Sequence, residues 1–412
     1  MDSYIKRAEK IVARIDELAL ITEEKGCITR TFGTKQFLEG SKKVFDWMLE
    51  AGLLTTIDNI GNVRGKLLSD NPYAKKFVIG SHIDTVINAG KFDGPLGVIM
   101  GLDLLENLIK TKTKLPFHIE LIAFSDEEGV RFHTTYLGSK VVAGLFESNK
   151  LDEKDGHGIS LKEVINEMGG NYHLLPEDKI AEWLGYFEIH IEQGPVLYEK
   201  NIPIAVVTGI AGQQRAEITF TGVAGHAGTV PMDMRQDALA TAAEFVLETE
   251  KLALEQKDKI VATIGKLEVI QSASNVIPGK VVCTLDVRCA EIDVLNAAYN
   301  SIKETCYSVA EKRNVDVKWN LVQGTNPTKC DETLTNALKE AISQSGHPVI
   351  ELVSGAGHDG VPISAVSPIS MLFVRCFKGI SHNPLENAET KDIAAAIEVS
   401  DKFLEEVISN RL

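Results

Sequence analysis

The 412-residue sequence has no long apolar run, no block of basic residues and no closely spaced pair of cysteines. Because no apolar run approaches the roughly 20 residues that span a bilayer, we expect no membrane segment. A net charge of −15 without a basic stripe argues against nucleic acid as a partner, since phosphate groups would be repelled. The six cysteines are scattered and form no C-x-x-C pair, a pattern typical of reduced thiols in a cytoplasmic protein.

The first residues also lack the continuous apolar core and the cleavage site of a signal peptide. Instead, Ile5, Ile11, Ile15 and Leu18 recur at helical spacing, which predicts an amphipathic helix and again favours the cytoplasm. A chain of 412 residues exceeds one ordinary core. We therefore expect two domains, or one domain with a large insertion.

Short apolar runs alternate with helical patterns in the first half of the chain. Residues 75–84 (KKFVIGSHID) and 117–129 (FHIELIAFSDEEG) have the pattern of buried strands, and residues 96–110 between them have a helical period. This order predicts an α/β fold, with a mostly parallel sheet covered by helices. Such sheets carry their chemistry beyond the carboxyl ends of the strands, where the polar clusters 81–84 and 125–128 fall.

The pattern changes from about residue 208. Apolar and polar residues alternate over 215–225, 260–270, 281–292 and 314–322, and helical patterns occupy 236–252 and 292–312. This order predicts a ferredoxin-like α+β unit that buries one sheet face under two helices. We expect a catalytic domain built from residues 1–208 and 328–412, interrupted by an inserted domain over 209–327.

Four segments combine metal-capable side chains with glycine-rich turns. In the first, His82 and Asp84 lie on the same side of an extended chain, so the Asp84 carboxylate could hold the second nitrogen of a metal-bound His82. Asp93 follows between small residues, where a metal ion could approach closely. Taken alone, the H-x-D pattern is as often structural.

In the second segment, the adjacent Glu127 and Glu128 point to opposite sides of an extended strand. One of them could bind metal while the other moves protons, although a solvated acidic turn is the alternative. In the third segment, Glu188, His190 and Glu192 share one face of a strand. That face is either an exposed polar surface or a wall of the site, and the spacing leaves both possibilities open.

The fourth segment, residues 379–384, places His382 between glycine and proline directly after the apolar run MLFVRCF. A histidine at such a strand end is well placed as a ligand, although a lone one is more often structural. The four segments together supply three histidines and two or three carboxylates. These nitrogen and oxygen ligands suit Zn²⁺ or Mn²⁺.

Over essentially the whole chain, these segments resemble M20-type metallohydrolases, and more narrowly the amidase branch of N-carbamoyl-L-amino-acid hydrolases, ureidopropionases and allantoate amidohydrolases. The resemblance implies two divalent ions per subunit. One ion would be held by His82, Asp93 and His190, and the other by Asp93, Glu128 and His382. Asp93 would bridge them. The related peptidases usually have a carboxylate at the position of His190, which favours the amidase branch.

The resemblance further implies that Glu127 is the general base and that Asp84 orients His82. Two ions and the Asp93 and Glu128 carboxylates would leave a positive site, so a bridging water would ionise readily to hydroxide. Glu127 could take its proton and deliver it to the leaving nitrogen. Attack on a carbamoyl (ureido) carbonyl would give a carbamate that breaks down to ammonia and carbon dioxide.

His226 of the inserted domain stands among small residues and by itself has the pattern of a turn histidine. In the family that the chain resembles, this histidine reaches the substrate across the interface of a homodimer and stabilises the tetrahedral intermediate. This implies that the inserted domain is a lid and dimerisation domain.

The resemblance places the substrate carboxylate at Asn275 and Arg288, because arginine binds a carboxylate through two parallel hydrogen bonds. A surface position at the end of a strand is the alternative for Arg288. The remaining substrate-binding candidates are Gln193, Gln213, Arg215, Gly357 and His358.

The segments around residues 209–215, 225–232 and 354–359 resemble allantoate amidohydrolases more than carbamoylases. Gln213 and Arg215 suit allantoate, since its two ureido arms carry more hydrogen-bonding groups. Conversion of allantoate to ureidoglycine is the expected reaction, with N-carbamoyl-L-amino-acid hydrolase or ureidopropionase as the alternative. His190 disfavours a dinuclear peptidase, and the intact Glu127 disfavours an inactive binding protein. Gly360 differs from the alanine that is common at this position in the family that the chain resembles.

Overall fold

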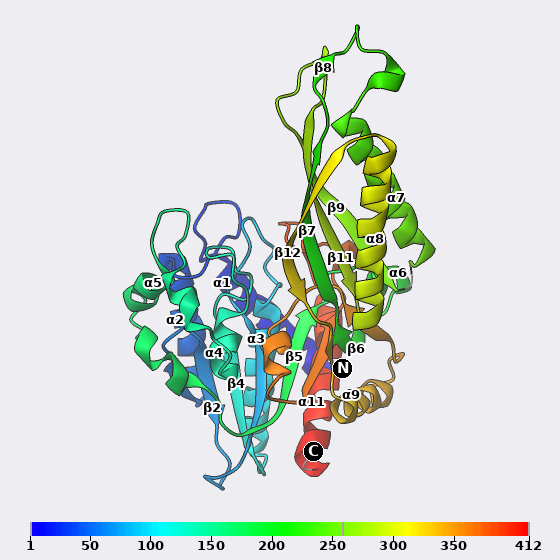
Figure 1. Ribbon diagram of the computed structural model, residues 1–412. Coiled ribbons are helices and arrows are strands. Elements are labelled where there is room, and N and C mark those ends of the chain that lie inside the picture. The colour runs from blue at the N-terminus through cyan, green and yellow to red at the C-terminus, as the bar shows by residue number, and fades with distance from the viewer. Residues whose placement is uncertain (1, 258, 411–412) are drawn as a thin grey trace. The chain divides into compact units, whose positions relative to one another are not determined.

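The computed structural model describes residues 2–257 and 259–410. The chain forms two compact units, each with its own hydrophobic core (Figure 1). Unit 1 comprises Met1–Thr208 and Lys329–Leu412, and unit 2 comprises Gly209–Thr328. Residues from both ends of the chain therefore share one core, with a separate core formed by the residues between them.

Unit 1 is built around a sheet whose nine described strands run in the order β1-β2-β4-β3-β5-β15-β6-β13, with β14 paired to β6. The strands are β1 (Leu54–Ile57), β2 (Val63–Leu67), β3 (Lys76–His82), β4 (His118–Phe124), β5 (Trp183–Ile191), β6 (Ile204–Ile210), β13 (Thr328–Lys329), β14 (Glu351–Ser354) and β15 (Ile369–Val374). Strands β4, β3, β5 and β15 are parallel, whereas β1, β2 and β6 join as antiparallel neighbours. The prediction of a parallel sheet is thus confirmed for its centre, and the flanking strands are antiparallel.

The strand–helix–strand pattern of the first half forms β3, α3 (Pro95–Thr111) and β4. Proline in the first turn suits the start of α3, because that position needs no N–H donor. The parallel register pairs Lys76 with His118 and His82 with Phe124. Both strands therefore end at the same level, and the polar residues that follow them emerge at one edge of the sheet.

Helices pack on both faces of this sheet. Ile79 of β3 and Leu121 of β4 pack against Gly101 of α3, whereas Glu188 of β5 points to the other face and accepts a hydrogen bond from the backbone N–H of Gly360. The helices of unit 1 are α1 (Asp2–Ala19), α2 (Lys35–Glu50), α3, α4 (Leu137–Ala143), α5 (Leu161–Glu167), α6 (Val196–Lys200), α9 (Glu332–Gln344), α10 (Gly360–Ile363) and α11 (Thr390–Asn410).

The polar residues of β5 do not form an exposed face. Glu188 and His190 of β5, and Glu192 directly after it, are all buried, because β5 lies between two neighbouring strands and is covered on both sides. Glu192 accepts hydrogen bonds from the first backbone N–H groups of α6, at Val196 and Leu197. Of the two interpretations open from the sequence, the exposed surface is excluded.

Unit 2 has the strand–helix–strand–strand–helix–strand order expected from its periodicity. Its elements are β7 (Gly212–Thr221), β8 (Gly225–His226), α7 (Ala238–Glu255), β9 (Ile260–Val269), β10 (Val276–Ile277), β11 (Lys280–Cys289), α8 (Ile292–Lys312) and β12 (Asp316–Thr325). The antiparallel sheet has the order β12-β7-β11-β9, and α7 and α8 pack on it. Alternate residues of β11, from Val281 to Cys289, enter the core under these helices, which leaves the other sheet face open.

Two further observations concern the chain as a whole. Within residues 2–257 and 259–410, no helix combines the length and the apolar character needed to cross a membrane. All six cysteines are free thiols, and Cys283, Cys289, Cys306 and Cys376 are buried.

Candidate metal centre

Segments far apart in the sequence meet at the carboxyl edge of the parallel strands. His82 is the last residue of β3, and His190 is the second-last residue of β5. Glu127 and Glu128 follow β4, and His382 follows β15. This edge is where α/β sheets carry their functional groups, because only loops and strand ends lie beyond it.

Three of the predicted ligands form a buried group around one oxygen of Asp93. His190 Nε2 lies 3.2 Å and His82 Nε2 lies 3.8 Å from Asp93 Oδ1. The ligand atoms of these three residues lie within 4.8 Å of one another, and all three residues are buried. They match one of the two ligand sets implied by the family resemblance.

A second group forms around the other oxygen of Asp93. His382 Nε2 lies 3.1 Å from Asp93 Oδ2 and 3.5 Å from Glu128 Oε1. The ligand atoms of Asp93, Glu128 and His382 again lie within 4.8 Å of one another. Each oxygen of the Asp93 carboxylate therefore serves a different group, which is the arrangement that a bridging carboxylate requires.

The donor atoms of both groups fit a divalent cation. His190 Nε2 is buried and lies 3.2 Å from Asp93 Oδ1 without being aligned for a hydrogen bond, although buried polar atoms are almost always paired. An ion at this position would supply the missing partner. Imidazole nitrogens with carboxylate oxygens are ligands that Zn²⁺ and Mn²⁺ accept, so the chemistry of the set agrees with the geometry.

Glu127 lies beside these ligands. Its carboxylate forms a third close group with His82 and Glu128, again with ligand atoms within 4.8 Å of one another. Burial raises the pKa of Glu127 well above its usual range, and the neighbouring Glu128 carboxylate raises it further. Burial also raises the pKa of Glu128, together with Asp93, to about 8. The cluster concentrates negative charge that nearby cations would compensate.

Asp84 contacts His82 differently from the prediction. The His82 Nδ1 hydrogen bond goes to the backbone carbonyl of Asp84 at 3.1 Å, and the nearer carboxylate oxygen is 3.8 Å away. The carboxylate instead accepts the backbone N–H groups of Glu127 and Glu128, at 3.1 and 3.2 Å. Asp84 therefore connects the His82 segment to the loop of the two glutamates. The buried guanidinium of Arg30 fixes the same segment through the Ile83 carbonyl at 2.8 Å.

Gln193 lies within the second ligand group. Its Nε2 donates to Asp93 Oδ2 at 2.9 Å and lies 3.5 Å from His382 Nε2. Both Gln193 and His382 adopt positive φ angles, which turn their segments sharply at the ends of the strands. The structure thus places this predicted substrate-binding residue next to the Asp93 carboxylate.

Gly357 and His358 lie on the loop after β14. The His358 ring packs edge-on against the His190 ring, with centroids 4.5 Å apart, and its Nε2 lies 2.7 Å from Ser354 Oγ. At Gly357, a Cβ atom would lie 1.8 Å from the Tyr136 hydroxyl, so a larger residue there would have to displace the Tyr136 side chain. His358 belongs to none of the three ligand groups, so its predicted contact with the substrate stays a prediction.

The other predicted substrate-binding residues belong to unit 2 and form two separate clusters. In the first, Arg215 and Arg288 both pair with Asp286, through Nε–O distances of 2.8 and 2.9 Å, and Gln213 lies opposite Arg288 on β7. Asp286 thus holds both arginines on the open face of the sheet. Two arginines and one aspartate leave this cluster with a net positive charge.

The second cluster of unit 2 contains His226 and Asn275. Strands β8 and β10 pair His226 with Val276, and the Asn275 carbonyl accepts the backbone N–H of Ala227 at 2.9 Å. This exposed pair follows Thr221, the far end of β7 from Gln213. Eight residues of strand, about 26 Å at 3.3 Å per residue, separate the two ends. Figure 1 shows β8 at the tip of unit 2.

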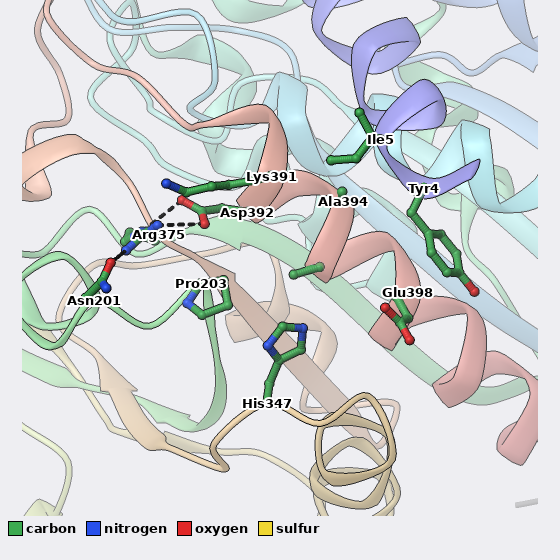
Figure 2. A pocket seen from close by; sticks show the side chains of 11 residues that line it. Tyr4, Ile5, Asn201, Pro203, His347, Arg375, Lys391, Asp392, Ala394 and Glu398 are labelled. Atoms are coloured by element: carbon green, nitrogen blue, oxygen red, sulfur yellow. Dashed lines mark hydrogen bonds and ion pairs between the residues drawn. The ribbon is translucent and has the colours of Figure 1, made fainter. Parts of the chain in front are cut away.

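A separate cavity of about 370 Å³ lies in unit 1, and no predicted site residue lines it (Figure 2). The Arg375 guanidinium makes two 2.8 Å hydrogen bonds to Asp392 and a third bond to Asn201. The other charged residues that line the cavity also have partners, since Lys391 pairs with Glu389, and Glu398 pairs with Lys402. The cavity therefore offers no uncompensated group comparable to the metal centre.

Comparison with known proteins agrees with the ligand geometry. Residues 78–406 match the family model described as peptidase family M20/M25/M40. The chain belongs to this family. The matched range includes every residue of the three ligand groups.

Relatives within the family place the chain in its amidase branch, as its motifs predicted. It is 37% identical to allantoate deiminase 2 of Glycine max, covering 96% of this chain and 89% of that protein. It is 36% identical to an N-carbamoyl-L-amino acid amidohydrolase of Geobacillus stearothermophilus, covering 95% and 97%. A hydantoinase/carbamoylase-family amidase of Burkholderia multivorans superposes with a TM-score of 0.91 at 32% identity, covering 97% and 98%.

Two residues near the ligands were not predicted from the sequence. Ser381 and Glu386 flank His382, and both contact the Asp93 segment. The available signal was their place within the same short segment, S-H-N-P-L-E, as a predicted ligand. Serine and glutamate are common in surface turns, so their types alone did not distinguish them.

Proposed function

We propose that the chain is a metal-dependent amidohydrolase that cleaves the C–N bond of a carbamoyl (ureido) group with two divalent ions, Zn²⁺ or Mn²⁺. One observation carries this proposal: the two oxygens of the buried Asp93 carboxylate point into two separate sets of nitrogen and oxygen ligands. His82 and His190 would complete one site, and Glu128 and His382 the other. The names of the relatives, which are amidohydrolases and deiminases, support the same chemistry.

When bound, the ions would polarise the substrate carbonyl and lower the pKa of a bound water. Glu127 is buried beside both ligand sets, where it can take a proton from the attacking water. The C–N bond then breaks, and Glu127 returns this proton to the leaving nitrogen. The other product is a carbamate, which decomposes to ammonia and carbon dioxide. Asp84 holds the backbone of Glu127 in position throughout.

Allantoate is the proposed substrate, and ureidoglycine the proposed product. The relatives named allantoate deiminase support this choice, as do the polar Gln213 and Arg215 in unit 2. Arg288 would bind the carboxylate, with Gln193, Gly357 and His358 contacting the substrate near the ions. Asn275 lies beside His226 at the other end of β7, so it would reach the same carboxylate only from the partner subunit. The similarity to N-carbamoyl-L-amino acid amidohydrolases supports the alternative, a carbamoyl amino acid.

A turnover panel tests these assignments. Chelated protein, resupplied with Zn²⁺ or Mn²⁺, is offered allantoate, N-carbamoyl-L-amino acids, ureidopropionate and dipeptides. Hydrolysis of allantoate with the highest kcat/KM supports the proposal, and preference for a carbamoyl amino acid supports the alternative. A dipeptide as the best substrate would contradict the carbamoyl chemistry altogether.

We further propose that unit 2 serves as a lid and forms a homodimer, with His226 completing the site of the partner subunit. Exposed apolar residues on its two edge strands, Val261 on β9 and Leu321 and Val322 on β12, support association through this unit. Mixing equal amounts of the His226→Ala and Glu127→Gln variants tests the shared site. After subunit exchange, about half of the dimers would be heterodimers, and one of the two sites in each heterodimer would be intact. The mixture would therefore recover about a quarter of the wild-type activity. If His226 acts within its own subunit, no activity returns.

The cytoplasm is the proposed location. The free state of all six cysteines supports it, since an oxidising compartment favours disulfides. Fluorescence imaging of the tagged chain in its host tests this assignment, and accumulation outside the cytoplasm would contradict it.

A further inference from the structure

Glu386 is a buried carboxylate directly behind the bridging ligand. It is 4% exposed, lies four residues after His382 and belongs to none of the three ligand groups. A glutamate is rarely this buried without specific partners. Its partners therefore indicate what it does.

One oxygen of Glu386 fixes the backbone at Asp93. Oε1 accepts the backbone N–H of Phe92 at 2.7 Å and that of Asp93 at 3.1 Å. The chain packs closely around this contact, since a Cβ atom at Gly90 would lie 2.2 Å from the Glu386 carboxyl carbon. The backbone of the bridging residue is thus held by a side chain from the segment that carries His382.

The other oxygen acts on the Asp93 side chain through Ser381. The Ser381 hydroxyl lies 3.0 Å from Glu386 Oε2 and 2.9 Å from Asp93 Oδ2. A hydroxyl has a single proton, so Ser381 can donate to only one of these carboxylates at a time. If an ion were bound to Asp93 Oδ2, the Ser381 hydroxyl could donate its proton to Glu386 instead. Ser381 would therefore have an acceptor both with and without the ion.

We propose that Glu386 is a positioning residue of the metal centre. It ties the Asp93 segment, before α3, to the His382 segment, after β15, and so controls whether both ions bind at their bridged positions. The inference rests on the proposed two-metal function. The second ligand group depends on it more, because the His382 side chain is 49% exposed and lies on a loop after β15.

Manganese binding to Glu386→Ala and Glu386→Gln tests this role without any activity measurement. The alanine variant leaves the Phe92 and Asp93 N–H groups without an acceptor, so we expect the weaker Mn²⁺ ion to lose about 10- to 100-fold in affinity. The electron paramagnetic resonance signal of two exchange-coupled Mn²⁺ ions is expected to disappear with it. The glutamine variant keeps an oxygen acceptor, so we expect its affinity to stay within about threefold of wild type.

Glu389→Ala is the matched control, because Glu389 lies nearby in sequence but pairs with Lys391 outside the ligand groups. It is expected to bind two coupled ions like the wild-type protein. Unchanged affinity and coupling in Glu386→Ala would overturn the positioning role, as would equal losses in the glutamine and alanine variants. Wild-type protein that binds fewer than two ions would instead overturn the two-metal proposal itself.

Ser381→Ala keeps the test decisive if Glu386→Ala does not fold. It removes only the hydroxyl between the two carboxylates, so we expect a smaller loss of about 3- to 10-fold for the weaker ion. Wild-type binding and coupling in this variant, together with their retention in a folded Glu386→Asp variant, would overturn the inference.

Discussion

The metal centre of unit 1 and the arginine cluster of unit 2 are both compact groups of charged side chains, but they balance their charges in opposite ways. At the metal centre, Asp93 and Glu127 are buried, and the carboxylates outnumber the cations that face them. In unit 2, Asp286 lies between two arginines that are 44% and 26% exposed. The buried cluster therefore has an excess of negative charge away from solvent, whereas the exposed cluster has a net positive charge that solvent screens.

The pKa shifts follow this difference. Burial raises the pKa of Glu127 and of Glu128, and the neighbouring carboxylates raise both pKa values further. Burial also acts to raise the pKa of Asp286, but hydrogen bonds from Arg288 and Arg215 outweigh it and lower that pKa below its usual value. Coulomb interactions weaken in solvent, so substitutions are expected to have larger effects in unit 1 than in unit 2.

The largest effect is expected from Glu127→Gln. The substitution keeps the size of the side chain but removes the proton carrier, so kcat is expected to fall by about 10²- to 10⁴-fold. Steady-state kinetics and elemental analysis measure activity and metal content on the same samples. The variant is expected to retain both ions, and near-normal turnover would rule out Glu127 as the base.

Acid pH is expected to weaken metal binding strongly. Burial lowers the pKa of His190, but the adjacent Asp93 reverses this and raises it to about 9; Asp93 likewise raises the pKa of His382 to about 9. Below pH 9 both imidazoles therefore carry protons that an ion must displace. Affinity for Mn²⁺ is expected to fall by about tenfold or more per pH unit between pH 8 and 6. Calorimetry in buffers of different ionisation enthalpy measures the released protons, and binding without proton release would contradict this.

Arg288→Ala is expected to have a smaller effect, mainly on KM. Because the side chain is partly exposed, removing its carboxylate contact is expected to cost about 1–2 kcal/mol, or about 5- to 30-fold in KM. Kinetics with allantoate measure the change, and Arg215→Ala shows whether the effect belongs to the whole cluster. If KM stays unchanged in both variants, the substrate carboxylate binds elsewhere.

Salt is expected to have the smallest effect and to separate the two clusters directly. Raising NaCl from about 0.05 to 0.5 M screens exposed charges, so KM is expected to rise by no more than about threefold. Metal content, which depends on the buried groups, is expected to stay constant. Loss of metal at high salt with an unchanged KM would contradict the view that the arginine cluster is the more sensitive of the two to solvent screening.

Two strands, β11 and β5, show which structural features could be predicted from the sequence and which could not. The alternation of residues 281–289 predicted β11, because one face of that strand enters a core and the other does not. The same rule was ambiguous for Glu188, His190 and Glu192. A central strand is buried on both faces, so the positions of its polar residues do not indicate which face is exposed to solvent.

Asp84 shows a different limit. Its position two residues after His82 indicated a contact between them, but the spacing could not distinguish its carbonyl from its carboxylate. Two backbone N–H groups from the loop after β4 bind the carboxylate, and that loop is more than 40 residues away in sequence. Competition among distant donors decided the outcome.

By itself, the sequence determined the strand–helix order, the kinds of metal ligand and the likeness to the amidase branch of its family, because periodicity and residue type are local properties. Only the tertiary structure decided that each oxygen of Asp93 serves a different ligand group and that Glu386 holds the Asp93 backbone. These features depend on side-chain directions and on packing between segments almost 300 residues apart. The local spacing of residues in the sequence predicts neither the side-chain directions nor this packing.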